Sequence, residues 1–346
     1  MSFSAGIVGL PNVGKSTLFK VLTRKEVNIA SYPFTTIDPN IGIVTVPDQR
    51  LEKIVETVKP EKLTPTIIEF VDIAGLVKGA HRGEGLGNQF LAQIRNCDAI
   101  LEVIRAFESQ DIEHVTGEVE PERDIEIIEF ELLMKDLETL EKLSPKLEKE
   151  AKKDKKIERK LESLKRIKQA VSQGELISEI DLSDDEKNEI KEYQFLTAKP
   201  ILYILNIDEK NRNLNLNFAF KHLKMNLKDE VEISELSKSE VEELGVKSQL
   251  DELILSCYSI LDLITFYTIA GGKEVRAWTL KYGSGVLKAA GLVHSDFERK
   301  FIKGEAIGWE KLVEAKSWTK AREMGWLRTV GKSYVVEDGE IIEFKI

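Results

Sequence analysis

Residues 9–16 read Gly-Leu-Pro-Asn-Val-Gly-Lys-Ser, a glycine-rich run that can wrap an anion. The run follows a short apolar segment and precedes a helical pattern, which is the context of a phosphate-binding P-loop. In such a loop, backbone amides and the helix N-terminus hold the phosphates, the lysine reaches the β- and γ-phosphates, and the serine hydroxyl binds Mg²⁺. We therefore predict binding of a nucleoside triphosphate with Mg²⁺, with contacts from Gly9, Asn12, Val13, Gly14, Lys15, Ser16 and Thr17.

A second motif, Asp72-Ile73-Ala74-Gly75, ends an apolar segment downstream. It has the DxxG pattern of switch-type NTPases, in which the acid can hold the metal through a water molecule and the Gly75 amide can contact the γ-phosphate. Thr35 and Thr36 lie where a first-switch threonine would close over Mg²⁺. The DxxG pattern alone is weak evidence, but its spacing from the P-loop favours a switch-type site.

The composition describes a chain large enough to position such a site. At about 150 residues per domain, its 346 residues predict two or three domains, and 42% hydrophobic residues can form a large core. Cys97 and Cys257 stand alone, so neither a disulfide framework nor a structural zinc is expected, and a reducing intracellular location follows. No apolar run approaches the length of a membrane span. The net charge of −10 disfavours a polyanionic partner on average.

Four apolar, β-rich runs carry the polar motifs at their ends. They cover residues 5–10, 66–71, 98–105 and 200–206, with helical patterns such as 15–22 and 86–95 between them. Nearly continuous apolar strands indicate a sheet that is covered on both faces. The alternation predicts an α/β fold with a mostly parallel, doubly wound sheet.

The pattern changes between residues 129 and 195, where Lys, Glu and Leu dominate and leucines recur at helical spacing. We interpret this part as an inserted helical hairpin with its turn at Ser172-Gln173-Gly174. Residues 142–168 carry a net charge of +7, whereas residues 174–192 carry −6. The two arms could neutralise one another as a solvated coiled coil, or the basic arm could present a face to phosphate backbones.

A third composition begins after residue 261, with hairpin-like alternation and turn glycines that predict a small mixed β module. Its four tryptophans are expected to belong mainly to the module's core. The predicted domains are therefore a P-loop NTPase domain (1–128 and 196–260), the inserted hairpin (129–195) and the β module (261–346).

Several motifs together resemble the Obg-related P-loop NTPases and, within them, the YchF or Obg-like ATPase group. The motifs cover nearly the whole chain and are Asn12–Thr17, Tyr32–Thr36, Asp72–Val77, Gly83–Asn88, Asn206–Glu209 and His294–Arg299. The resemblance implies a GTPase-like domain with a helical insertion, a C-terminal TGS domain of β-grasp type, and association with the ribosome. It also implies that Ser16 and Thr36 are the magnesium ligands.

The residues expected near the base favour ATP over GTP. Guanine is usually read by Asn-Lys-x-Asp, whereas this chain has Asn206-Ile207-Asp208-Glu209, with a longer acid and no lysine. A carboxylate facing adenine N1 would be repelled, while main-chain carbonyls near Ile207 and the Asn206 amide could serve N6 and N7. Ser234-Glu235-Leu236, in place of a Ser-Ala-Lys base loop, also disfavours guanine. A GTPase with a degenerate motif remains the alternative.

The residue after Gly75 is Leu76, whereas a Ras-like enzyme has a glutamine that orients the attacking water. An aliphatic side chain cannot orient water, so we expect slow intrinsic hydrolysis. Among the loop histidines, similarity to the family favours His114 over His81 as the catalytic group. Asn12 could help to hold a monovalent cation such as K⁺ that stabilises the transferring phosphoryl group, or it could simply shape the loop.

Two functional interpretations follow. In the first, a cytoplasmic, monomeric ATPase switch associates with the ribosome or structured RNA through basic patches. In the second, the chain is an ATP-dependent regulator that binds protein partners, and hydrolysis is incidental. Phosphoryl transfer to a small metabolite is disfavoured, because no second-substrate constellation is visible.

Overall fold

The computed structural model describes residues 3–24, 40–73, 88–151, 154–211 and 220–346. The strands are β1 (Phe3–Val8), β2 (Ile41–Thr45), β3 (Lys62–Thr64), β4 (Ile67–Asp72), β5 (Ala99–Ala106), β6 (Ile201–Ile207), β7 (His222–Met225), β8 (Leu263–Ala270), β9 (Glu274–Lys281), β10 (Lys303–Gly308), β11 (Arg328–Val330) and β12 (Glu340–Lys345). The helices are α1 (Lys15–Thr23), α2 (Gln49–Val58), α3 (Asn88–Asn96), α4 (Pro121–Ala151), α5 (Lys155–Ser172), η3 (Ile177–Glu179), α6 (Asp184–Ile190), η4 (Lys191–Tyr193), α7 (Leu227–Glu235), α8 (Lys238–Leu244), α9 (Leu250–Ile260), α10 (Val286–Val293), α11 (Ser295–Arg299), α12 (Trp309–Ala315) and α13 (Trp318–Glu323).

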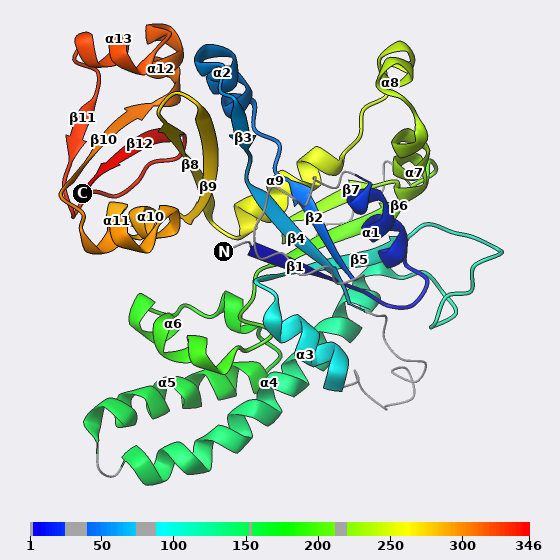
Figure 1. Cartoon of the computed structure of the whole chain (residues 1–346). Helices are drawn as coiled ribbons and strands as arrows, with labels where there is room; N and C mark the ends of the chain where they lie inside the picture. Colours follow the sequence, from blue (N-terminus) through cyan, green and yellow to red (C-terminus); the bar gives the residue numbers. More distant parts are fainter. Residues whose placement is uncertain (1–2, 25–39, 74–87, 152–153, 212–219) are drawn as a thin grey trace. The chain divides into compact units, whose positions relative to one another are not determined.

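The first sheet carries the predicted phosphate site and has the strand order β2-β4-β1-β5-β6-β7 (Figure 1). Strands β1, β5, β6 and β7 pair in parallel. Every residue of β5 is buried, as expected for a central strand covered on both faces. The predicted α/β fold with a mostly parallel sheet is confirmed, and the carboxyl ends of its strands lie at a common edge.

The chain forms two compact units, and their division differs from the predicted domains. One unit comprises Ser4–Val21 and Phe70–Ser248, and the other comprises Met1–Phe3, Leu22–Glu69 and Gln249–Ile346. The segment 22–69 therefore joins the C-terminal module in one unit, because β3 pairs in parallel with β9 and α2 buries apolar side chains in the module's core. Such long-range pairing has no local signal in the sequence.

The C-terminal module has the predicted β character. Its sheet has the order β11-β10-β12-β8-β9-β3, in which β8 and β9 form an antiparallel hairpin. The four tryptophans are partly buried and pack against the two core clusters of this unit, which confirms their interpretation mainly as core residues; they are Trp278, Trp309, Trp318 and Trp326.

The helical insertion is longer than predicted and turns at a different place. Helix α4 begins at Pro121, before the predicted boundary at residue 129, and α4 and α5 form the antiparallel pair seen in Figure 1. Ser172–Gly174 ends α5 instead of forming the hairpin turn, with Gly174 at a φ of 89°. The chain reverses earlier, between the end of α4 and the start of α5, where a lysine-rich segment without glycine or proline gave no turn signal.

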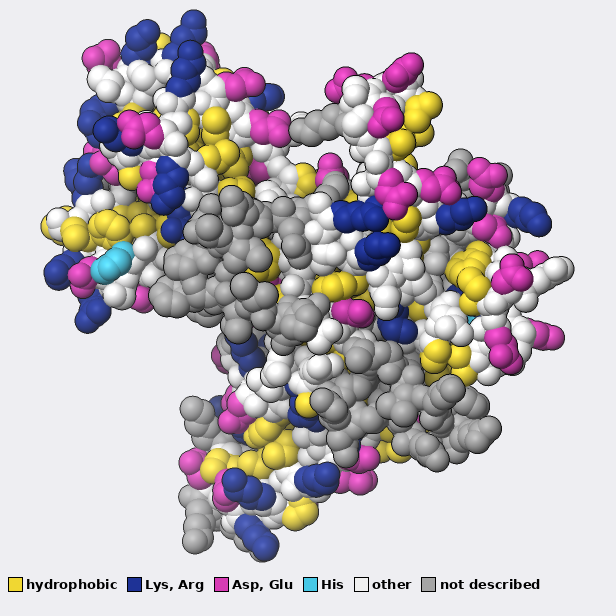
Figure 2. Space-filling view, turned by 45° about the vertical axis from the view of Figure 1, so that its right-hand side comes forward, with side chains coloured by type: hydrophobic (Ala, Val, Ile, Leu, Met, Phe, Trp, Pro, Cys, Tyr) yellow, Lys and Arg dark blue, Asp and Glu magenta, His cyan; other side chains and the backbone are white. Residues whose placement is uncertain are grey.

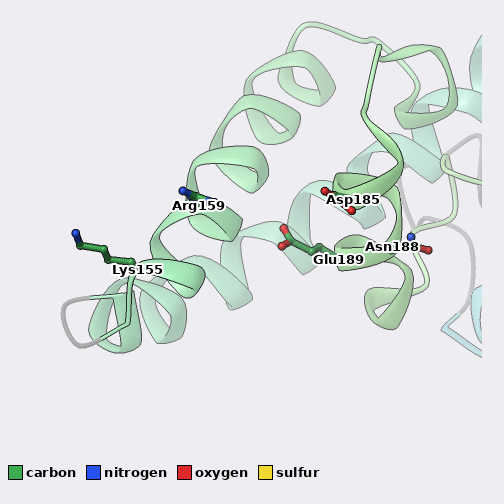
Figure 3. Close-up of a pocket in the computed structure, with 5 residues that line it drawn as sticks. All are labelled: Lys155, Arg159, Asp185, Asn188 and Glu189. Atoms are coloured by element: carbon green, nitrogen blue, oxygen red, sulfur yellow. The ribbon is translucent and has the colours of Figure 1, made fainter.

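The charges of the insertion neutralise one another in part. Arg166 of α5 pairs with Glu186 of α6 at 2.8 Å, and Lys160 pairs with Glu192. Figure 3 shows a cavity between α5 and α6 whose lining mixes two cations with two carboxylates and an asparagine: Lys155, Arg159, Asp185, Asn188 and Glu189. Figure 2 nevertheless shows Lys and Arg side chains exposed along its lower edge, over the α4–α5 pair.

A buried carboxylate anchors α4 to the segment that leads back into the sheet. Asp136 is fully buried and accepts hydrogen bonds from the Leu196 amide (2.8 Å), the Thr197 amide (2.7 Å) and the Thr197 hydroxyl (2.7 Å). Burial raises the pKa of Asp136, and the three hydrogen bonds oppose that rise. The position of α4, whose N-terminal turn carries Asp124, is thereby fixed relative to β6. Within the described residues, no helix has the length and apolar character needed to cross a membrane.

Candidate nucleotide-binding site

The glycine-rich loop joins β1 to α1, as the sequence predicts, and two of its glycines are sterically required. Gly9 has a φ of 147°, and a Cβ there would lie 2.3 Å from the Val103 carbonyl oxygen. Gly14 has a φ of 110°, and its Cβ would lie 2.7 Å from Asn206 Nδ2. Only glycine adopts these conformations at such close approach. The loop is therefore held tightly against β5 and β6 while its helix begins at Lys15.

Lys15 lies with Asp72 at the centre of the site. Its ammonium donates to the Leu10 carbonyl oxygen at 2.7 Å, and the residue is buried. Burial lowers the pKa of Lys15 to about 8, and the nearby Asp72 carboxylate opposes this shift. Asp72, at the end of β4, is itself half-buried and has a raised pKa because of desolvation. The structure thus brings together the P-loop lysine and the DxxG aspartate, and a polyphosphate would restore the charge environment that the buried ammonium lacks.

The other predicted P-loop contacts line the first turn of α1. Ser16 is exposed there and Thr17 is half-buried. Val13 is buried, so its backbone is the part available for contacts. Asn12 has a left-handed φ of 65°, and its amide donates to the Glu113 carbonyl at 3.3 Å.

Asn206 couples the P-loop to the far side of the site. Its Nδ2 donates to the Val13 carbonyl at 2.9 Å, and its Oδ1 accepts from the Leu227 amide at 3.2 Å. Both ends of this buried amide are therefore used within the protein. Asn206 holds the P-loop against the N-terminus of α7 in this arrangement, and its contribution to reading N6 or N7 of a base stays a prediction.

The remaining base-site predictions are divided by the structure. The Ile207 side chain packs in the core beside Tyr203, which leaves only its main chain for a base, whereas Glu209 is exposed just after β6. Ser234 needs correction, because it lies in the last turn of α7 and donates to the Val231 carbonyl at 2.6 Å. The loop that abuts Asn206 is instead Asn226-Leu227, directly after β7.

Sequence reasoning missed the Asn226-Leu227 loop because a serine further along the chain, Ser234, resembles the start of a Ser-Ala-Lys loop. Asn226 is the N-cap of α7, and its side chain accepts hydrogen bonds from the Lys228 and Asp229 amides. An asparagine that follows a short strand and precedes an acidic turn is a helix-start signal and could have located this loop.

His114, the predicted catalytic residue, is buried in the segment between β5 and α4. One ring nitrogen lies 2.8 Å from the Thr116 hydroxyl, and the other lies 2.9 Å from Asp124 Oδ2. The preceding residue, Glu113, contacts Asn12 of the P-loop. The segment that carries His114 therefore reaches the phosphate loop, although the ring itself points to α4. Several other predicted residues, namely Thr35, Thr36, Gly75, Leu76 and His81, lie outside the described residues.

Comparisons with known proteins identify the family. The family model described as 50S ribosome-binding GTPase matches residues 4–136, and the YchF-GTPase_C model, described as a protein of unknown function, matches residues 263–346. A curated relative from Bacillus subtilis (strain 168), named "Ribosome-binding ATPase YchF", is 45% identical over 100% of this chain and 99% of its own length. The chain belongs to the YchF family.

Other YchF relatives agree over the same span. The curated proteins of that name from Pasteurella multocida (strain Pm70) and Escherichia coli O157:H7 are 44% and 43% identical, over 100% and 99% of this chain and 99% of each relative. The solved "Structure of the Schizosaccharomyces pombe YchF GTPase" has 36% identity and a TM-score of 0.88, covering 99% of this chain and 98% of that chain. These findings confirm the predicted family and enzyme class, a P-loop ATPase, whereas the two kinds of name differ on the base.

Proposed function

We propose that this protein hydrolyses ATP in preference to GTP and acts as a nucleotide-dependent switch on the ribosome. The observation that carries the proposal is the site in which Lys15 and Asp72 lie together beside an Asn206–Glu209 strand end that lacks the guanine-reading acid. The names of the curated relatives, which specify ATP and the ribosome, support it.

The donor set fits Mg²⁺. Ser16 offers a hydroxyl at the first turn of α1, and Asp72 offers a carboxylate at the end of β4. Hard oxygen ligands of this kind, together with phosphate oxygens and water, suit Mg²⁺. Ser16 and Thr36 would hold the ion, Asp72 would act through water, and the Gly75 amide would contact the γ-phosphate. When bound, Mg²⁺ would neutralise charge on the phosphates. Asn12 remains the candidate that would help to hold K⁺.

Base selection would rest on Ile207, Glu209 and the newly located Asn226-Leu227 loop. Guanine recognition needs a carboxylate that accepts from N1–H and the exocyclic amine, and Glu209 is displaced by one methylene from that geometry. An adenine would instead use main-chain groups near Ile207 and Leu227. A GTPase with a degenerate motif is the alternative, and the description of the Schizosaccharomyces pombe protein as a YchF GTPase supports it.

His114 would supply the catalytic group that Leu76 cannot. The contact of Glu113 with Asn12 supports this role, because it holds the histidine's segment against the phosphate loop. In the structure the ring is engaged elsewhere, so catalysis would require a change of position. This requirement agrees with the slow intrinsic hydrolysis that we expect.

The partner is proposed to be the ribosome or structured RNA, bound by a cytoplasmic monomer. Exposed cations of α5, such as Arg159, and of the C-terminal module, such as Lys281 and Arg299, could contact phosphates. A protein-binding regulator with incidental hydrolysis is the competing interpretation. The partly neutralised charges between α5 and α6 favour that competitor to the extent that they occupy the basic arm.

Cosedimentation with purified ribosomes across a salt series tests the partner. We expect binding that depends on the bound nucleotide and weakens steeply with salt, because neutralising several phosphates releases counterions. The charge-reversing variant Arg159→Glu should bind more weakly than the wild type, whereas Glu162→Gln on the same helix should not. Binding that is absent, or that is insensitive to salt, would favour the protein-binding regulator.

A further inference from the structure

His114 is enclosed by partners from its own segment and from α4. Its Nε2 lies 2.9 Å from Asp124 Oδ2, and only 2% of each of these two side chains is exposed. On the other side of the ring, Nδ1 faces the Thr116 hydroxyl at 2.8 Å and the Thr116 backbone amide at 3.3 Å. Both ring nitrogens are therefore used inside the protein.

These partners select one tautomer of the neutral ring. The Thr116 backbone amide can only donate, so Nδ1 must accept. The Asp124 carboxylate accepts, so Nε2 must carry the proton and donate. The charge-assisted bond to a buried carboxylate is the stronger of the two sides. Asp124 therefore contributes most to holding the ring in its present orientation.

The surroundings of Asp124 keep it available as an acceptor. Arg123 Nε lies 4.0 Å from its other oxygen, and the buried Arg105 guanidinium also attracts it. Burial raises the pKa of Asp124, while His114 and Arg123 oppose that rise. Among the described residues, Asp124 Oδ1 has no hydrogen-bond partner, so Oδ2 and its bond to His114 account for the hydrogen bonding of this carboxylate.

The clamp lies one residue away from the phosphate loop. Glu113 contacts Asn12 through its carbonyl, while the His114 ring turns away from that loop and into the protein. A ring with both nitrogens satisfied and almost no exposed surface cannot orient a water molecule on a γ-phosphate. Breaking the bond to Asp124 would free Nε2 while the backbone of Glu113 stays at the P-loop.

We propose that Asp124 is a positioning residue that clamps His114 in a retracted orientation, and that release of this clamp limits hydrolysis in the isolated enzyme. The inference rests on the proposed catalytic role of His114. It assigns the slow intrinsic rate to a specific contact between the β5–α4 segment and α4, in addition to the absence of a glutamine after Gly75. A partner that accelerates hydrolysis would act by separating these two side chains.

The substitution Asp124→Asn tests the clamp because it conserves shape and removes the charge. We expect kcat for ATP with Mg²⁺ to rise about five- to tenfold, with little change in KM, since a modest loss of clamp energy shifts the population of released His114 by that order. Glu122→Gln is the matched control, because it removes an exposed charge from the same helical turn. Its kcat should equal that of the wild type. A kcat for Asp124→Asn that is unchanged or lower would overturn the proposal.

A second variant covers the case in which Asp124→Asn folds poorly. Thr116→Val removes the hydroxyl on the Nδ1 side from an exposed position and keeps the backbone amide. We expect a smaller rise in kcat, of about twofold, with an unchanged melting temperature. A fall in kcat would count against the clamp.

Two further measurements separate the clamp from the catalytic role. Imidazole ¹⁵N shifts of His114 without nucleotide should report the Nε2–H tautomer in the wild type and a mixture in Asp124→Asn; identical spectra would refute the clamp. Adding His114→Ala to Asp124→Asn should abolish the gain in kcat, and a persisting gain would refute it too. If His114→Ala alone leaves hydrolysis unchanged, the catalytic role fails, whereas the ¹⁵N result still decides whether the clamp exists.

Discussion

Replacing Lys15 with alanine is expected to lower kcat for ATP hydrolysis by about 10²–10³-fold, the usual effect of removing one preorganised donor to developing charge. Lys15 is the ammonium that the P-loop, Asp72 and burial hold in place, and its present hydrogen bond to Leu10 is one that a phosphate oxygen can replace. Nucleotide affinity should fall as well. Steady-state hydrolysis with Mg²⁺ and a binding titration measure the two effects.

The control for this prediction is Lys20→Ala, which removes an exposed lysine from the same helix, α1. It should retain wild-type kcat and affinity. If Lys15→Ala hydrolyses ATP at the wild-type rate, the P-loop does not hold the reacting phosphates and the assignment of the site is wrong.

The second large effect is expected for His114→Ala, which should lower kcat by about 10²–10⁴-fold, the range of general acid–base catalysis. KM for ATP should change little, because the ring lies outside the P-loop contacts in the structure. Single-turnover hydrolysis, together with the melting temperature, separates lost chemistry from lost stability, since the substitution also leaves Asp124 without its partner.

His294→Ala is the matched control, because this exposed histidine belongs to the C-terminal module, where it caps α11. It should hydrolyse ATP as the wild type does. A His114→Ala enzyme that is folded and fully active would show that another group activates the water, and the role proposed for His114 would then be withdrawn.

The parts of the site that follow from local patterns were predicted well. The glycines of the P-loop are required by positive φ angles and by contacts with β5 and β6, and the spacing of Gly9, Gly14 and Lys15 carries that requirement in the sequence. Asp72 was found because a buried strand ends in an acid, and the edge of a parallel sheet brings such ends together.

Features that depend on distant residues were not predictable in the same way. The engagement of Asn206 with Val13 and Leu227 involves three separate segments, so its sequence motif indicated a base contact and not the coupling seen here. Ser234 was predicted from its local resemblance to a base loop, whereas the fold places the corresponding loop at Asn226. The clamp on His114 also depends on tertiary structure, because Asp124 reaches the ring only through the start of α4.

The central claim, a P-loop site that prefers adenosine, is tested most directly by competition between ATP and GTP for the isolated protein with Mg²⁺. A fluorescent ATP analogue would be displaced by either nucleotide, and we expect ATP to act at concentrations at least about tenfold lower, since one mismatched base contact costs about 1–3 kcal/mol. Displacement by micromolar GTP, with ATP far weaker, would contradict the account and identify a GTPase with a modified base motif.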